Sequence, residues 1–264
     1  MNPKLLLLIF IVSTQSAFCI NPMREYKIKP DQFKIGYQEL KVITKDGYEL
    51  NTWIMESTAA IKKEHTFIIA GSDAGNMGFT LSYAVYLLKA GYDVVTFDYR
   101  GFGASSDFDF NPNNMYHTAY ITDFVTIVNW VKKEKQAKKI GILAFSMGSL
   151  IATSGFEKSS YDFLACEGFI YSPKQNQSRI KQQKDKKLIL PDDAKNYNRR
   201  LKELDIPILL FAGSLDQITT LKDSKRVARK KPQAKVIEFD GAHLKGALTM
   251  GIDKYINEIT VMAN

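Results

Sequence analysis

Residues 139–150 read KIGILAFSMGSL, an apolar run that ends at Phe145 and is followed by a segment of small residues. The apolar run predicts a buried strand, and the segment after it predicts a helix. Ser146 then occupies the tight turn between the two elements. Gly148 has no side chain, so the helix can pass close to the strand, and Ala144 is almost as small on the other side of the serine. A strand, a tight turn and a helix in this order are typical of a parallel sheet with helices packed on it.

Apolar runs and helical patterns alternate in the same way along the rest of the chain. We expect strands at residues 33–43, 49–56, 66–70, 93–98, 139–145, 164–171, 206–212 and 234–239, and helices at 79–89, 118–134, 147–157, 192–203, 221–230 and 244–261. The turn at 45–47, with its Asp-Gly pair, suits a hairpin between the first two strands. Strands that alternate with helices form a parallel sheet covered on both faces, so the sequence predicts an α/β fold. No internal repeat interrupts the pattern, and we expect one domain over residues 20–264.

The composition excludes several classes of protein. The chain has 264 residues, of which 45% are hydrophobic and 24% are charged, and its mean hydropathy is −0.19. The apolar content is too high for a disordered chain, and long apolar runs of the kind found in polytopic membrane proteins are missing. Two cysteines cannot build a disulfide scaffold or a four-cysteine zinc site, and three histidines argue against a dedicated metal enzyme. We therefore expect no metal and no cofactor.

The net charge of the chain is +8, and its lysines gather at residues 132–139, 181–187 and 222–231. Such an excess can indicate an anionic partner or a basic, soluble surface. None of the three runs is interleaved with aromatic residues as in proteins that bind single strands, and none lies in a motif that reads DNA. We interpret them as solvated faces and expect no nucleic-acid partner.

The segment Gly101–Ser106 follows an expected strand and resembles the glycine-rich fingerprint of dinucleotide-binding proteins. In those proteins the glycines open a helix whose N-terminus faces the pyrophosphate. Here the next residues, 107–112, read DFDFNP, which is acidic and typical of a loop. The sequence therefore argues against NAD binding.

Residues 1–19 predict a secretory signal peptide. Lys4 supplies a positive charge, residues 5–12 form an unbroken apolar run, and the segment ends in Ala17-Phe18-Cys19. The run is shorter than the about 20 residues needed to span a bilayer. We expect cleavage after Cys19 and a periplasmic or extracellular protein. A bacterial lipoprotein signal, with lipid on Cys19 and hence contact with a membrane, is the first alternative, and a buried N-terminal strand or helix is the second.

Three residues that follow expected strands could supply the chemistry of a serine nucleophile. Ser146 lies beside a helix N-terminus, whose amides can stabilise negative charge. His243, just after the last expected strand, would act as its base, and Asp216, just after the preceding strand, would orient that base. The carboxyl ends of parallel strands share one edge of a sheet, so all three side chains can meet there. Taken alone, each has a simpler explanation: a turn serine, a helix-capping aspartate and a loop histidine.

Two backbone amides are expected to hold the negative charge that develops on a substrate carbonyl. One belongs to Met147, directly after Ser146. The other would come from the small residues after the strand at 66–70, where Asp73 is our first choice and Ser72 our second.

The ordered combination of these motifs resembles the α/β-hydrolase superfamily, in the branch of serine aminopeptidase-like and monoacylglycerol-lipase-like proteins. The matching segments are KDGYEL at 45–50, DAGNMG at 73–78, DYRGFGAS at 98–105, AFSMG at 144–148, GSLD at 213–216 and GAH at 241–243. The resemblance implies an α/β-hydrolase fold, with a mostly parallel eight-stranded sheet, helices on both faces and a minimal lid. The family usually has His-Gly after the third strand, where this chain has Ala70-Gly71 or Gly71-Ser72.

The residues and the resemblance together predict an exported serine hydrolase that cleaves carboxylic ester or related acyl bonds of a small-molecule substrate through an acyl-enzyme. The alternative is a binding or scaffold protein that has the same fold without the chemistry. No obligate protein partner is evident. Residues 172–187, at the position of the family's lid, are polar, with Ile180 as their single large aliphatic residue. A polar lid predicts an open site for short or water-soluble acyl groups.

Overall fold

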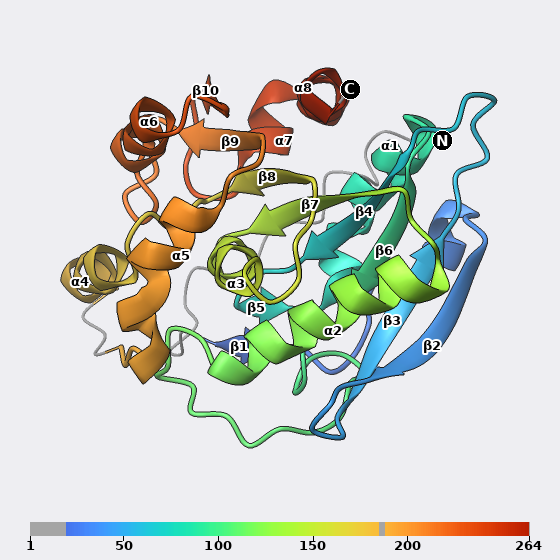
Figure 1. The fold of residues 1–264 in the computed structure, drawn as a ribbon, viewed down its shortest axis with the longest axis horizontal. Helices are drawn as coiled ribbons and strands as arrows, with labels where there is room; N and C mark the ends of the chain where they lie inside the picture. Colours follow the sequence, from blue (N-terminus) through green and yellow to red (C-terminus); the bar gives the residue numbers. More distant parts are fainter. Residues whose placement is uncertain (1–19, 185–187, 264) are drawn as a thin grey trace.

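A sheet of eight strands runs through the middle of the protein (Figure 1). Its strands are β2 (Tyr37–Ile43), β3 (Glu49–Met55), β4 (His65–Ala70), β6 (Asp93–Phe97), β7 (Lys139–Phe145), β8 (Phe163–Glu167), β9 (Ile208–Gly213) and β10 (Ala234–Phe239). Their order across the sheet is β10-β9-β8-β7-β4-β6-β3-β2. β3 pairs antiparallel with β2 and β6, and every other neighbouring pair is parallel. The predicted mostly parallel, eight-stranded sheet is thus confirmed.

The computed structural model describes residues 20–184 and 188–263. The predicted signal peptide at residues 1–19 lies outside these ranges. Two short strands stand apart from the main sheet: β1 (Asn21–Pro22) pairs in parallel with β5 (Ala74–Gly75).

Helices cover both faces of the sheet, as the alternating pattern predicts (Figure 1). One face carries α1 (Leu81–Lys89) and α8 (Ile252–Ala263), whose buried residues share a core cluster. The other face carries α2 (Thr118–Glu134), α3 (Met147–Gly155), α5 (Tyr197–Glu203) and α6 (Leu221–Lys230). The remaining helices are α4 (Pro173–Lys184) and α7 (Gly246–Met250), with single-turn 3₁₀ helices at Pro30–Phe33, Met77–Thr80 and Asp192–Asn196. Within the described ranges, no helix has both the length and the apolar character needed to cross a membrane.

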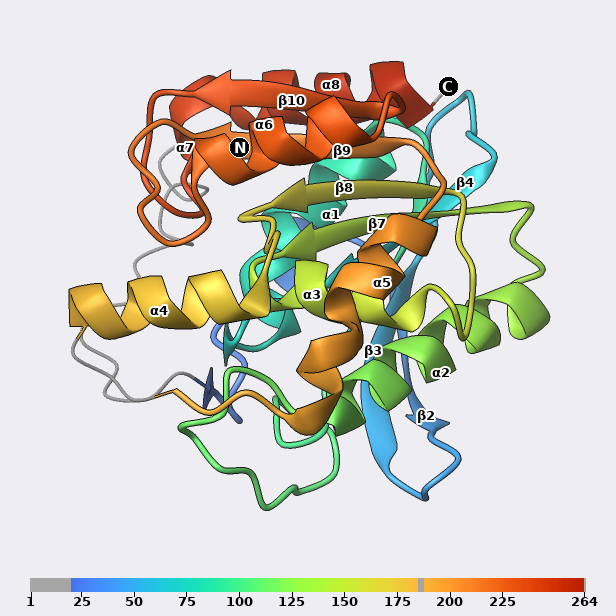
Figure 2. The ribbon, with the colours of Figure 1, turned by 60° about the vertical axis from the view of Figure 1, so that its left-hand side comes forward.

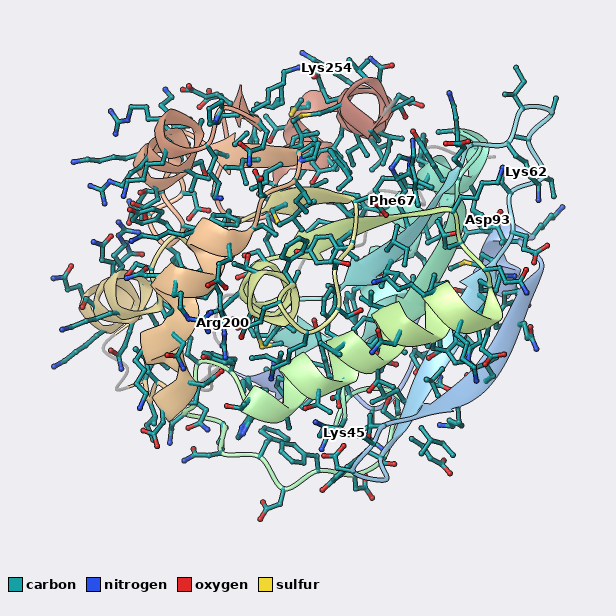
Figure 3. The ribbon with its side chains drawn as sticks, in the orientation of Figure 1. Lys45, Lys62, Phe67, Asp93, Arg200 and Lys254 are labelled. Atoms are coloured by element: carbon teal, nitrogen blue, oxygen red, sulfur yellow. The ribbon has the colours of Figure 1, made fainter. Side chains whose placement is uncertain are left out.

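Alternation along the central strands divides the core into two layers. In β7, Ile142 and Ala144 pack into the cluster with α2 and α3, whereas Leu143 and Phe145 pack into the cluster with α1 and α8. Successive side chains of a strand point to opposite faces, so a strand covered on both sides is apolar throughout. Figure 3 shows Phe67 in the interior of the molecule, while Lys62 and Lys254 lie at its periphery. Full burial of a large apolar side chain contributes about 1.5–3 kcal/mol to the stability of the fold.

Three of the element boundaries that differ from the sequence predictions lie near a residue with positive φ. The strand predicted at 33–43 begins only at Tyr37, after a 3₁₀ turn that ends at Lys34 with φ of 56°. The strand predicted at 164–171 ends at Glu167, because Gly168 has φ of 73° and turns the chain away. The helix predicted at 244–261 is divided by Gly251, whose φ is 84°, into α7 and α8. A residue in the left-handed region interrupts a strand or helix, and periodicity alone does not reveal where that happens.

The carboxyl ends of the parallel strands lie on one side of the molecule. In Figure 2 the arrowheads of β7, β8 and β10 point to the same side, and α4 projects beyond it. Helix α4 has 12 residues and lies in the segment that the sequence analysis expects to be a minimal lid. Side chains that follow β7, β9 and β10 are brought to the same edge.

Candidate active site

Ser146 lies on the turn between β7 and α3, in a strained conformation. Its φ is 49° and its ψ is −111°, a region that costs a non-glycine residue on the order of 1–3 kcal/mol. The Ser146 amide donates to the carbonyl oxygen of Glu167 at 2.9 Å. A Cβ at Gly148 would overlap the carbonyl oxygens of Ala70 and Gly71, so only glycine lets α3 begin this close to β4. The close packing holds the serine in the sharp turn that the sequence pattern predicts.

Asp216 and His243 lie on the loops after β9 and β10, which are neighbours in the sheet. His243 Nδ1 is 2.7 Å from Asp216 Oδ2, and His243 Nε2 is 3.1 Å from Ser146 Oγ. When the Nδ1–H group donates a hydrogen bond to the carboxylate, Nε2 carries no proton and can accept the proton of the serine hydroxyl. The structure therefore brings together the three side chains that the sequence analysis selected.

Three further hydrogen bonds fix the Asp216 carboxylate. Oδ1 accepts from the amides of Ile218 at 2.8 Å and Thr219 at 2.9 Å, and Oδ2 accepts from the Thr219 hydroxyl at 2.6 Å. Burial raises the pKa of Asp216. The hydrogen bond and the charge of His243 lower it, as do the hydrogen bonds from Thr219. These lowering effects outweigh burial, so the pKa of Asp216 lies below its usual value of 3.8. The role of Thr219 was not predicted from the sequence, where its only signal is a hydroxyl residue three positions after Asp216.

His243 has a raised pKa for the complementary reason. Burial lowers the pKa of the imidazole, but the hydrogen bond and charge of Asp216 raise it, with smaller contributions from the charges of Asp73 and Glu167, and the net pKa is above 6.5. The site thus stabilises an imidazolium, which is the form that a base reaches after accepting a proton.

Glu167, the last residue of β8, is a buried carboxyl beneath the loop that carries His243. It is 1% exposed, and its Oε1 accepts the backbone N–H of Gly246 at 2.6 Å. Burial raises the pKa of Glu167 to about 7, against the lowering effect of the Gly246 amide. Because its carbonyl also accepts the Ser146 amide, Glu167 bonds both the turn of the serine and the loop of the histidine. Glu167 was not predicted from the sequence, although a single acid in an otherwise apolar strand is a usable signal.

The two amides predicted to stabilise an oxyanion belong to α3 and to the segment that follows β4. Met147 is the first residue of α3, where backbone amides lack partners within the helix. Gly148, near the N-terminus of α3, packs against the carbonyl oxygens of Ala70 and Gly71. These two residues directly precede Ser72 and Asp73 in the chain. The Asp73 carbonyl accepts the Asn21 amide at 2.8 Å, beside the β1–β5 pair. The oxyanion roles of Met147 and Asp73, with Ser72 second, stay predictions.

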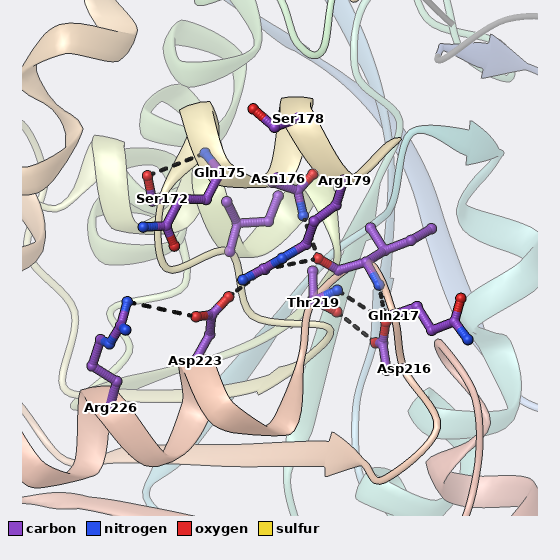
Figure 4. A network of polar contacts seen from close by, with 12 residues as sticks. Ser172, Gln175, Asn176, Ser178, Arg179, Asp216, Gln217, Thr219, Asp223 and Arg226 are labelled. Atoms are coloured by element: carbon purple, nitrogen blue, oxygen red, sulfur yellow. Dashed lines mark hydrogen bonds and ion pairs between the residues drawn. The ribbon is translucent and has the colours of Figure 1, made fainter. Parts of the chain in front are cut away.

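Helix α4 is attached to the loop of Asp216 by polar contacts (Figure 4). Asn176 Nδ2 and Arg179 NH1 donate to the carbonyl oxygen of Ile218 at 3.1 Å and 3.2 Å, and Arg179 also forms an ion pair with Asp223 on α6. Ile218 is in turn bonded through its amide to Asp216. The position of α4 is therefore linked directly to the loop that carries Asp216.

The other two histidines have packing roles. His65 is 6% exposed and lies against the rings of Phe67 and Tyr92, and His117 lies against Phe108 and Tyr120. Across residues 20–184 and 188–263, no group of three or more His, Cys, Asp or Glu side chains is arranged to hold a metal ion.

A protein-family model matches part of the chain. Residues 65–178 match the family model of the serine aminopeptidases, S33. This range includes β4, the segment around Asp73 and the turn of Ser146. Across the curated proteins, the chain is 24% identical over 262 residues to the Escherichia coli (strain K12) protein YfhR, described as uncharacterized, and the match covers 92% of this chain and 87% of that one.

Solved structures with the same architecture include several esterases. The Pyrococcus furiosus esterase Pf2001 superposes with a TM-score of 0.73 at 19% identity, covering 92% of this chain and 96% of that one. An esterase from Exiguobacterium antarcticum superposes with a TM-score of 0.61 at 14% identity, covering 86% and 100%. At these identities the structural likeness shows the fold.

The chain has the fold of the α/β-hydrolases, and its residues 65–178 resemble the serine aminopeptidases, S33. The family match and the esterase structures together support a serine hydrolase of the α/β-hydrolase type.

Proposed function

We propose that this protein is an exported esterase-type hydrolase that acts through Ser146, His243 and Asp216 and forms an acyl-enzyme. The observation that carries the proposal is the position of His243, with Nε2 3.1 Å from Ser146 Oγ and Nδ1 2.7 Å from Asp216 Oδ2. A nucleophile, a base and an orienting acid at hydrogen-bond distances are the requirements of nucleophilic acyl transfer.

In the proposed mechanism, Ser146 Oγ attacks the substrate carbonyl carbon while His243 Nε2 takes the hydroxyl proton. The carbonyl oxygen becomes an oxyanion, which the amides of Met147 and Asp73 stabilise. When the tetrahedral intermediate collapses, the C–O bond to the alcohol breaks, and the imidazolium returns its proton to that leaving oxygen. Water then attacks the acyl-serine with His243 again as base, which releases the acid and restores the Ser146 hydroxyl.

Reaction with a fluorophosphonate probe tests the proposal against a non-catalytic scaffold on the same fold. The hydrolase should be labelled by the probe, and mass spectrometry of the digested protein should place the adduct on Ser146. A protein that hydrolyses no p-nitrophenyl ester and takes up no probe would be a scaffold instead.

The pH dependence of ester hydrolysis should report the titration of His243. The base must be neutral to accept a proton, so kcat/KM should fall as the pH drops through the His243 pKa. Because Asp216 raises that pKa above 6.5, the midpoint of the acid limb should also lie above 6.5. The variant Asp216→Asn lacks the carboxylate charge that raises the pKa of His243. The acid limb of its residual activity should therefore move to lower pH. A wild-type limb centred below 6.5 would contradict the assignment of His243.

Short acyl chains should be preferred over long ones. A cavity beside the serine turn, which Gly71, Ser72 and Phe145 help to line, measures about 30 Å³, room for only a few atoms. Helix α4, at the lid position, offers Ile180 as its single large aliphatic residue, whereas a long chain needs an apolar lining to recover about 0.8 kcal/mol per methylene. We expect kcat/KM for p-nitrophenyl acetate and butyrate to exceed that for the palmitate, without activation at a lipid interface. A rise in kcat/KM from short to long chains, measured below micelle formation, would refute the open site.

Export is the part of the proposal that rests on residues 1–19 alone. N-terminal sequencing of protein recovered from its native host should find Ile20 as the first residue, or a lipid-blocked Cys19. Recovery of the chain from the cytosol with Met1 intact would show that it is not exported.

A further inference from the structure

A second cavity lies away from Ser146, where α5 and α6 meet the start of α4. These three helices gather on one side of the molecule (Figure 1). The cavity has a volume of about 430 Å³ and is lined in part by Tyr171, Gln175, Lys202, Arg226, Lys230 and Lys231. This volume is within the roughly 300–1,000 Å³ of sites that hold small molecules. We call this cavity the basic cleft.

The lining of the basic cleft is one-sided in charge. Four of its residues are basic, Lys202 from α5 and Arg226, Lys230 and Lys231 from α6 or its end, and none of its lining residues is an Asp or Glu. Among the described residues, the three lysines form no ion pair, and Arg226 reaches an acid only at 4.0 Å, the carboxyl of Asp223. That carboxyl already forms a closer ion pair with Arg179 (Figure 4). A concave surface lined by one sign of charge concentrates ions of the opposite sign.

Tyr171 holds two of these cations in place. The Arg226 guanidinium lies 5.2 Å from the centre of the Tyr171 ring and the Lys230 ammonium 5.4 Å, and Lys230 Nζ also donates to the Tyr171 hydroxyl at 2.8 Å. Cations held against the ring and the hydroxyl of one tyrosine are partly ordered before a ligand arrives, which lowers the entropic cost of binding. Arg226 and Lys230 are four residues apart on α6, so both face the cleft from successive turns.

Lys231 contributes charge from a fixed position. Its Nζ donates to the carbonyl oxygens of Lys202 at 3.2 Å and Leu204 at 2.7 Å, at the end of α5. Burial lowers the pKa of Lys231 and thus disfavours its charged form. An anion bound in the cleft would act in the opposite direction and favour the charged form.

We propose that the basic cleft binds the phosphate group of a small phosphomonoester. A phosphate dianion matches several convergent cations better than a single carboxylate does, and the fork of Arg226 can bond two of its oxygens. Gln175, from α4, supplies a neutral amide to the lining. The lining contains none of Ser146, Asp216 and His243, so the proposal does not rest on the proposed esterase chemistry.

Titration calorimetry with inorganic phosphate, at constant ionic strength set with sodium chloride, tests this proposal. Wild-type protein should bind phosphate saturably. The double variant Arg226→Gln, Lys230→Gln should bind at least about tenfold more weakly, since each tenfold loss is only about 1.4 kcal/mol and two charge-assisted contacts are removed. Lys202→Gln, which changes the wall formed by α5, should also weaken binding.

The matched control is Lys222→Gln, Arg229→Gln. This pair removes one lysine and one arginine from the same helix at exposed positions outside the cleft lining, and phosphate affinity should stay within about twofold of wild type. Thermal midpoints measured in chloride establish that every variant is folded. Non-saturable binding by wild type, or equal weakening in the control pair, would overturn the proposal and indicate only a general attraction to a basic surface.

Two further ligands distinguish the source of the phosphate group. Glycerol 3-phosphate represents a soluble phosphomonoester, and phosphatidylcholine vesicles with and without phosphatidic acid represent a lipid headgroup. Binding of glycerol 3-phosphate that the double variant loses supports the soluble ligand. Binding confined to vesicles with phosphatidic acid, whether or not the double variant loses it, rejects a small phosphomonoester.

Discussion

Replacement of Ser146 by alanine should lower ester turnover by several orders of magnitude and abolish labelling by a fluorophosphonate. The hydroxyl is the group that would form the covalent bond, and the remaining activity would come from the oxyanion amides and substrate binding, about 10³–10⁴-fold over water. The thermal midpoint should change little, since alanine keeps the Cβ in the same strained turn and only an oxygen 3.1 Å from His243 Nε2 is lost.

Ser214→Ala is a suitable control for this variant. Ser214 follows β9 at the same edge of the sheet, and its hydroxyl donates to Asp240 at 2.9 Å, outside the Ser146 group. Turnover and labelling should both survive the loss of this hydroxyl. If Ser146→Ala kept its labelling, the nucleophile would be a different residue and the proposed mechanism would fail.

The second large effect should come from the acid that orients His243. Asp216→Asn would place an amide NH₂ where Oδ2 now accepts from His243 Nδ1 at 2.7 Å. The imidazole would then turn its unprotonated nitrogen to the amide and its N–H to Ser146, so it could no longer take the serine proton. We expect kcat to fall by about 10⁴-fold, the effect of the wrong tautomer in a Ser-His-Asp group.

Asp240→Asn is the matched variant for this second effect. Asp240 has the same side chain, lies three residues before His243 and is exposed, with its Oδ1 bonded to Ser214. Its replacement should leave kcat within about twofold, because a surface substitution away from the reacting groups rarely matters. If Asp240→Asn abolished turnover and Asp216→Asn did not, the two acids would have to exchange roles.

Much of the candidate site could be predicted from local sequence. The turn after β7 was predictable because its requirements are local: an apolar strand, a serine, and Gly148 where α3 must pass the carbonyl oxygens of Ala70 and Gly71. Asp216 and His243 were predictable because each directly follows a buried strand, and parallel strands bring their carboxyl ends to one edge. Element order and side-chain type suffice for such inferences.

The tertiary structure alone decided the groups that support this site. Glu167 reads as one acid in an apolar strand, and only the fold places its carboxyl under Gly246 and its carbonyl at the Ser146 amide. Thr219 likewise becomes a partner of Asp216 through the path of one loop. The same holds for the basic cleft, because Lys230 belongs to a lysine run that the sequence indicates as a solvated face, whereas Lys202 comes from a different segment of the chain.

The physical reason for this division is the range of the interactions involved. Burial, periodicity and turn conformation act within a few residues along the chain, so the sequence by itself determined the sheet, its helices and the three side chains at strand ends. Hydrogen bonds between loops, the pKa shifts of His243 and Glu167, and the gathering of like charges around a cavity depend on distances across the fold. Such distances exist only once β8, β9 and β10 are packed side by side.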